Sequence, residues 1–71
     1  MSPEGNFTVF CVESYKTYKG MSGKQVVCLF EKYNVFDYLH EFYDILHTAG
    51  YQYINRDIDE YLINRDAFTQ I

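Results

Sequence analysis

The chain has 71 residues, of which 48% are apolar, and its formal net charge is −4. This length leaves no room for two hydrophobic cores, and the negative charge disfavours nucleic acid, because duplex binding depends mainly on the neutralisation of phosphates. No apolar run approaches the roughly 18 residues of a membrane span. We therefore expect a single domain over residues 1–71, without a nucleic-acid or membrane partner.

The first segment predicts a helix with one apolar face, because its apolar side chains recur every three or four residues. Two starts are open: Asn6 as N-cap, or Ser2 followed by Pro3 in the first turn. Gly20 suits the left-handed conformation that follows a helix end. We expect residues 1–5 to be frayed. The apolar positions are Phe7, Phe10, Cys11, Tyr15 and Tyr18.

A second helix is predicted from the capping box formed by Ser22 and Gln25, three residues apart. Asn34 is expected to end it in the left-handed conformation. The pattern predicts a third helix over residues 36–48, which Gly50 ends.

Residues 51–56 allow either an irregular link or an early helical turn. Asp57 is predicted to be the N-cap of a short fourth helix that ends near Arg65, and residues 67–71 are expected to fray. No segment alternates between apolar and polar residues with a period of two. We therefore predict an all-α fold, a compact bundle of three to four short helices with no sheet.

The two cysteines, Cys11 and Cys28, both lie within apolar runs. Buried free thiols pack as small apolar groups, so both are expected in the core. Two cysteines are too few for a disulfide scaffold, and the first residues lack the basic and apolar regions of a secretory signal. We expect a cytoplasmic protein with reduced thiols.

Three residues of the predicted third helix could share a face and hold a divalent metal: His40, Asp44 and His47. A solvent-exposed face with local His–Asp pairs explains the same spacing. We favour that second interpretation, and expect no enzymatic activity, no metal and no cofactor. A small metal-dependent enzyme that uses this face is an alternative.

The two helices on either side of Asn34 are also compatible with a helix-turn-helix regulator of DNA. The recognition helix would then span residues 36–44, which contain three carboxylates and neither Lys nor Arg. Such a helix is poorly suited to contact bases or phosphates. DNA binding is therefore retained only as an alternative.

The most informative feature is an excess of aromatic residues, eight Tyr and six Phe. A bundle of this length cannot bury them all, and tyrosine is enriched at protein interfaces. Residues 1–34 have a charge balance of +1 and residues 35–71 a balance of −5. We expect the acidic half to bind a basic protein partner or a second copy of the chain. The residues expected to bind this partner are Tyr38, Tyr51, Tyr53, Asp59 and Glu60.

Several runs of the chain resemble a family of short, uncharacterised bacterial proteins, common in Firmicutes and known only as a domain of unknown function. The most specific part is Leu-His-Thr-x-Gly at residues 46–50, followed by Tyr53-Ile54 and then Asp-Ile-Asp at residues 57–59. The chain has Asn34 where the family pattern has glycine. The other matching runs are residues 21–26, 29–35, 37–39 and 60–61.

The resemblance implies an accessory or antitoxin-like partner of a co-encoded protein similar to ADP-ribosyltransferases. It gives no activity to the motif residues. We expect His47, Thr48 and Gly50 to organise the end of the third helix, through side-chain bonds to backbone groups left free there. Asp57 has the structural role of an N-cap.

Overall fold

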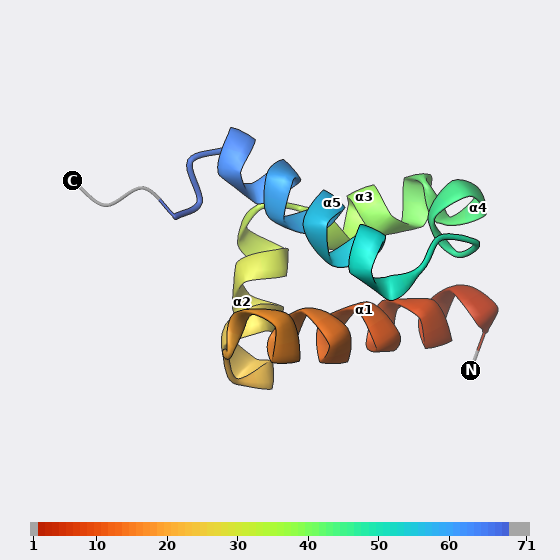
Figure 1. Cartoon of the computed structure of the whole chain (residues 1–71), viewed down its shortest axis with the longest axis horizontal. Helices are drawn as coiled ribbons and strands as arrows, with labels where there is room; N and C mark the ends of the chain where they lie inside the picture. Colours follow the sequence, from red (N-terminus) through yellow and green to blue (C-terminus); the bar gives the residue numbers. More distant parts are fainter. Residues whose placement is uncertain (1, 69–71) are drawn as a thin grey trace.

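The computed structural model describes residues 2–68, and Figure 1 shows that they form helices joined by short turns. No strand occurs among these residues, so the prediction of an all-α fold without a sheet is confirmed. The expectations for residues 1 and 69–71 lie outside the described part of the chain. The helices are α1 (Pro3–Lys19), α2 (Gly23–Lys32), α3 (Val35–Glu41), α4 (Tyr43–Leu46) and α5 (Tyr51–Asn64).

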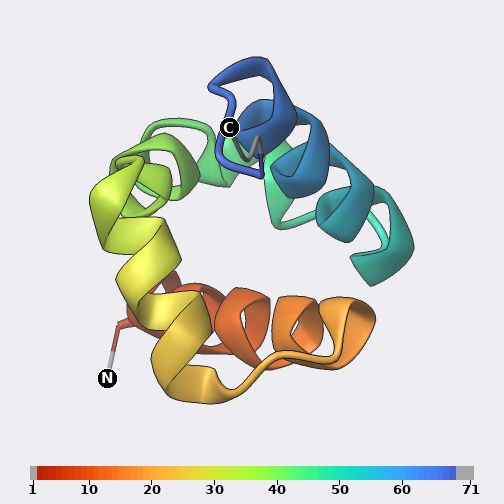
Figure 2. The same cartoon turned by 90° about the vertical axis from the view of Figure 1, so that its left-hand side faces the viewer.

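The helices surround a common core. In Figure 1, α1 and α5 run in the same general direction, α3 runs the opposite way, and α2 crosses steeply between them. Figure 2 shows α1, α2, α3 and α5 arranged in a ring. Of the helices within residues 2–68, none combines the length and the apolar character that a membrane span requires.

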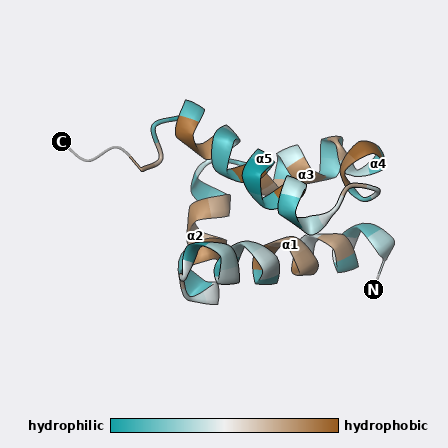
Figure 3. Ribbon diagram, viewed as in Figure 1, coloured by the Kyte–Doolittle hydropathy of each residue, from teal (hydrophilic) through white to brown (hydrophobic). Residues whose placement is uncertain are grey.

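The centre of this ring is filled by ten buried apolar side chains. Figure 3 shows apolar and polar residues alternating along the helices, as expected when each helix buries one side. Burying a large apolar side chain stabilises a fold by about 1.5–3 kcal/mol, so these residues supply most of the driving force. They are Cys11, Tyr15, Val26, Phe30, Val35, Leu39, Leu46, Ile54, Ile58 and Leu62.

The first helix uses the earlier of its two possible starts. Ser2 is the N-cap, and its side chain accepts a hydrogen bond of 3.0 Å from the backbone N–H of Gly5. Pro3 occupies the first turn, where its missing N–H costs nothing. Residues 3–5, expected to be frayed, therefore form the first turn of α1. Gly20 ends the helix with a φ of 65°, as predicted.

The turns around the second helix follow the sequence pattern closely. The Ser22 side chain bonds the backbone N–H of Gln25, and the Gln25 side chain bonds the backbone N–H of Ser22, which confirms the capping box. Asn34 has a φ of 59° and confirms the predicted left-handed turn. This residue sets the angle between α2 and α3.

The prediction of one continuous third helix over residues 36–48 is wrong. The helix is interrupted at Phe42, which separates α3 from α4. The adjacent rings pack in different places: the Phe42 ring lies 5.1 Å from the Tyr38 ring, and the Tyr43 ring lies 5.4 Å from the Phe7 ring of α1. The Tyr43 contact joins the segment after the break to α1.

The fifth helix starts seven residues earlier than an N-cap at Asp57 would place it, so residues 51–56 form the early helical turn that was one of the two alternatives for this segment. Gly50 is the residue before its first turn, with extended backbone, and residues 51–56 are helical. Asp57 lies in the middle of α5, so its assignment as an N-cap is wrong. The buried residues Ile54, Ile58 and Leu62 are four residues apart. This spacing is the sequence pattern that indicates the longer helix.

The two cysteines differ in burial. Cys11 is buried in the core, as predicted, whereas Cys28 is exposed on α2, so the prediction for Cys28 is wrong. Val26 and Phe30 of α2 face the core, and Cys28 lies between them in sequence on the other side of the helix. Burial raises the pKa of the Cys11 thiol to about 12.

This difference predicts the thiol chemistry of the folded protein. Because the thiolate is the reactive form, a disulfide reagent at pH 8 should modify Cys28 quickly and leave Cys11 unmodified. We expect one reactive thiol per chain in buffer and two in denaturant, measured by absorbance. Cys28→Ser should leave no fast thiol, and a fast reaction in that variant would contradict the structure.

The left-handed turn at Asn34 predicts a difference between two substitutions. Alanine in this conformation costs roughly 1–2 kcal/mol, whereas glycine adopts it freely. Asn34→Ala should therefore lower the free energy of unfolding by about 1 kcal/mol relative to Asn34→Gly, measured by urea denaturation. Equal stability of the two variants would show that the turn is not held in this conformation.

Candidate protein-binding groove

A groove of about 550 Å³ lies between α3 and α5, and we call it the acidic groove. Four of its lining residues have carboxylates, two from each helix. They are Asp37 and Glu41 of α3, and Asp57 and Glu60 of α5. Neutral and cationic residues complete the lining: Asn34, Tyr38, Phe42, Tyr61, Asn64 and Arg65.

Three aromatic rings of the acidic groove pack against one another. The Tyr38 and Tyr61 rings lie 4.5 Å apart, and the Phe42 ring lies 5.1 Å from that of Tyr38. The hydroxyl of Tyr61 donates a hydrogen bond of 2.9 Å to the backbone carbonyl of Tyr33, at the end of α2. The rings are therefore held in place by contacts within the chain.

The Tyr38 hydroxyl connects the two helices that form the groove. It donates a hydrogen bond to Oδ2 of Asp57. Burial, together with the bond to this carboxylate and its charge, raises the pKa of Tyr38 well above its usual range. The phenol therefore remains protonated and keeps donating to Asp57 at any physiological pH.

Arg65 is the only cationic residue among those that line the acidic groove. Its guanidinium carbon lies 3.6 Å from the centre of the Tyr61 ring, and its Nη1 donates to the backbone carbonyl of Tyr61. This is the geometry of a cation–π contact. One guanidinium against four carboxylates leaves the groove with an excess of negative charge.

The structure separates the five residues expected to bind a partner. Tyr38 and Glu60 line the acidic groove, whereas Tyr51 and Tyr53 are exposed at the start of α5 and line a different groove. Asp57, expected to be only a helix cap, is a groove residue.

Sequence reasoning missed the other residues of the acidic groove. The groove residues on α5 recur at helical spacing, at positions 57, 60, 61 and 64. Asp37 and Glu41 on α3 are likewise four positions apart. That spacing is visible in the sequence. The sequence does not show that the groove residues of α3 face those of α5. The missed residues are Asn34, Asp37, Glu41, Phe42, Tyr61, Asn64 and Arg65.

Asp59 faces α1 instead of the acidic groove. Its Oδ1 accepts a hydrogen bond of 2.7 Å from the hydroxyl of the buried Tyr15, and Nζ of Lys19 lies 3.1 Å away. Burial raises the pKa of Tyr15, and the bond to Asp59 raises it further. This contact joins α1 to α5, so the position of Asp59 points to a structural role.

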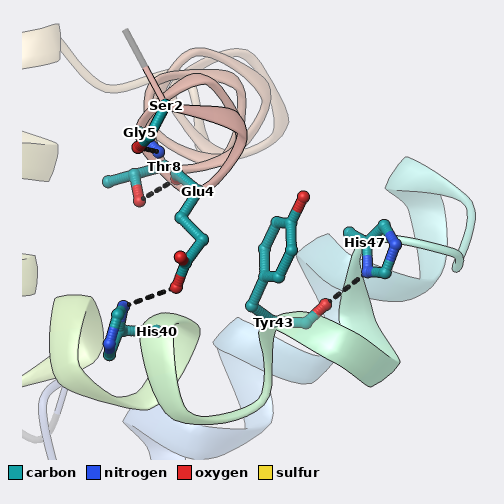
Figure 4. A network of polar contacts seen from close by, with 7 residues as sticks. All are labelled: Ser2, Glu4, Gly5, Thr8, His40, Tyr43 and His47. Atoms are coloured by element: carbon teal, nitrogen blue, oxygen red, sulfur yellow. Dashed lines mark hydrogen bonds and ion pairs between the residues drawn. The ribbon is translucent and has the colours of Figure 1, made fainter.

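The histidines of α3 and the turn after α4 lie apart. Figure 4 shows Nδ1 of His40 directed at Oε2 of Glu4, 2.9 Å away, and Nδ1 of His47 at the carbonyl of Tyr43, 2.6 Å away. The His47 ring also stacks on that of Tyr43. Within residues 2–68, no three potential ligands lie close enough to hold a metal ion. The break at Phe42 removes the helical spacing on which the metal hypothesis depended.

The motif around the end of α4 bonds to its own backbone. Thr48 donates from Oγ1 to the carbonyl of Ile45 at 2.9 Å, one residue after the His47 bond to Tyr43. Gly50, expected to end the third helix, is instead the extended residue directly before α5, and α4 already ends at Leu46. The two hydrogen bonds and the extended Gly50 together shape the connection between α4 and α5.

The surface of α3, which would contact DNA in the helix-turn-helix alternative, is unfavourable for DNA binding. The exposed residues of α3 include Asp37 and Glu41, and α3 contains no Lys or Arg. Two lysines of the amino-terminal half are engaged with carboxylates: Lys16 lies 3.0 Å from Glu13, and Lys19 pairs with Asp59. Phosphate contacts would have to compete with these pairs.

The different settings of two neighbouring acidic residues predict different effects on stability. Asp59→Ala should lower the free energy of unfolding by about 2 kcal/mol, because it leaves the buried Tyr15 hydroxyl without an acceptor. Glu60→Ala should change it by less than about 0.5 kcal/mol, because Glu60 is exposed. Chemical denaturation followed by circular dichroism measures both. Equal effects would contradict the assignment of Asp59 to the interior.

Comparison with known proteins identifies the family and leaves its activity open. The family model described as a protein of unknown function, DUF3791, matches residues 6–65, which include all of α2 to α5 and most of α1. No curated protein matches the chain, and no solved structure matches it. Since the match spans most of the sequence, the chain belongs to the DUF3791 family of proteins of unknown function.

Proposed function

We propose that this protein is a binding module whose acidic groove receives a basic segment of a protein partner. The observation that supports this most is the placement of four carboxylates around three packed aromatic rings, with one guanidinium among the lining residues. Carboxylates attract Lys or Arg side chains, and aromatic faces bind the same cations through their quadrupole.

The Arg65 contact illustrates the chemistry that such a partner would use. Its guanidinium lies on the Tyr61 ring and bonds a backbone carbonyl of α5. A partner arginine could make the same kind of contact with Tyr38 or Phe42 and pair with Asp37, Glu41 or Glu60. The groove offers groups that recognise a cation, instead of a nucleophile paired with a base.

The resemblance described above suggests which protein to test first. We propose that the partner is a co-encoded protein similar to ADP-ribosyltransferases, and that this chain is its accessory or antitoxin-like regulator inside the cell. The electrostatics of the acidic groove then require a basic surface on that protein. Complementary charge would raise the rate of association and fix the orientation of the complex.

Neutralising two groove carboxylates should weaken binding more than neutralising two carboxylates elsewhere. We expect Glu41→Gln with Glu60→Gln to raise the dissociation constant by roughly fivefold to tenfold, since each exposed pair is worth up to about 1 kcal/mol. The matched control is Glu13→Gln with Asp44→Asn, which removes the same charge outside the groove. We expect the control to change the constant by less than about twofold.

The measurement is titration of each variant with the purified co-encoded protein at low salt, with light scattering to exclude self-association as the source of the signal. Thermal melting followed by circular dichroism verifies that both double variants are folded. Equal weakening in the two variants would mean that only net charge matters. Unchanged binding in the groove variant would place the interface on another surface.

A further inference from the structure

A second groove, of about 750 Å³, lies between α1 and the first turns of α5. We call it the tyrosine groove, because three exposed tyrosines line it. It shares no lining residue with the acidic groove, and a small hollow lined by Tyr53, Arg56, Asp57 and Glu60 lies between the two. The tyrosine groove is lined by Ser14, Thr17, Tyr18, Gly50, Tyr51, Gln52, Tyr53, Asn55 and Arg56.

The aromatic side chains of this groove are open to solvent. Tyr18 is 47% exposed, Tyr51 56% and Tyr53 53%. Tyrosine rings offer faces and edges on which a planar ligand can pack, together with a hydroxyl at the rim. The volume lies within the usual range for small-molecule sites, roughly 300–1,000 Å³.

One end of the tyrosine groove is the amino-terminal end of α5. Gly50 provides no side-chain cap, and the first turn contains no acidic residue. The first N–H groups of a helix have no partner within that helix, and the helix dipole gives them a partial positive charge. In a helix of 14 residues this end favours an anion.

A nearly buried amide in the groove independently indicates a polar ligand. Asn55 is 4% exposed, and its Oδ1 accepts a hydrogen bond of 3.1 Å from Ser14. Its Nδ2 makes no side-chain hydrogen bond within residues 2–68. No fully buried side-chain nitrogen or oxygen in that part of the chain lacks a partner, so this Nδ2 keeps some exposure to solvent, and Asn55 lines the groove. It is a free donor in a protected position.

The tyrosine groove also contains a cationic side chain, that of Arg56. Arg56 lines the groove, is exposed, and makes no ion pair within 4.0 Å among residues 2–68, although it also lines a small hollow with Asp57 and Glu60. The other arginine, Arg65, is already stacked on Tyr61. Arg56 is therefore able to form charge-assisted hydrogen bonds with an anion that enters the groove.

We propose that the tyrosine groove binds a small aromatic anion of the aryl phosphate class. The ring packs against the tyrosines that line the groove. The anionic group lies at the amino-terminal end of α5, where the backbone N–H groups, the amide of Asn55 and the guanidinium of Arg56 donate to it. This site is independent of the protein-binding function proposed for the acidic groove.

The test is a titration of the full chain with phenyl phosphate at low salt, followed by chemical shifts of the backbone amides. We expect saturable shifts at residues 50–56 and at Tyr18. Arg56→Gln should weaken binding by roughly tenfold, the effect of losing a hydrogen bond to a charged group. Lys24→Gln, which removes an exposed cation outside both grooves, is the matched control and should bind as the unmodified chain does. Equal binding by the two variants, or shifts elsewhere, would overturn the proposal.

Two further probes separate the parts of the ligand. Inorganic phosphate and phenol should each bind more weakly than phenyl phosphate, by roughly tenfold or more, because each lacks half of the contacts. If inorganic phosphate binds as tightly as phenyl phosphate, the tyrosines do not contribute and the aryl phosphate assignment is wrong. Tyr51→Ala, at an exposed position, should weaken phenyl phosphate and leave inorganic phosphate unchanged.

Discussion

The bond between Tyr15 and Asp59 holds together the two longest helices of the protein. It brings a buried hydroxyl of α1 to a carboxylate of α5, and Lys19 neutralises that carboxylate from the same helix as Tyr15. The contact fixes the rotation of α5 about its own axis. With Asp59 turned toward α1, Asp57 and Glu60 lie on the side of α5 that faces α3. The two grooves on either side of α5 depend on this rotation.

Local chemistry made much of the fold predictable from the sequence. The capping box at Ser22, the left-handed residues Gly20 and Asn34, and the apolar spacing in α1 and α2 depend only on residues a few positions apart. Each of these features gives the same structure in many surroundings. The all-α prediction rested on them and was correct.

The errors arose where tertiary contacts decided the outcome. The helix that the sequence pattern would continue is interrupted at Phe42, and the ring of Tyr43, after the break, packs on Phe7 of α1. Asp57 resembles a cap, but the hydroxyl of Tyr38, nineteen residues away, is its partner. The acidic groove could be anticipated only in part: Tyr38, one of its two tyrosines, and Glu60 were expected to bind a partner, whereas the pairing of α3 with α5 could not be read from either helix alone.

The helix α5 contributes to three surfaces at once: the core through Ile54, Ile58 and Leu62, the acidic groove on one side and the tyrosine groove on another. Successive residues of an α-helix are turned by about 100°. Gain or loss of one residue near its middle would therefore rotate half of the helix and disrupt all three surfaces together. Evolution of this segment should proceed by substitution and not by changes in length, with insertions confined to the connections on either side of it.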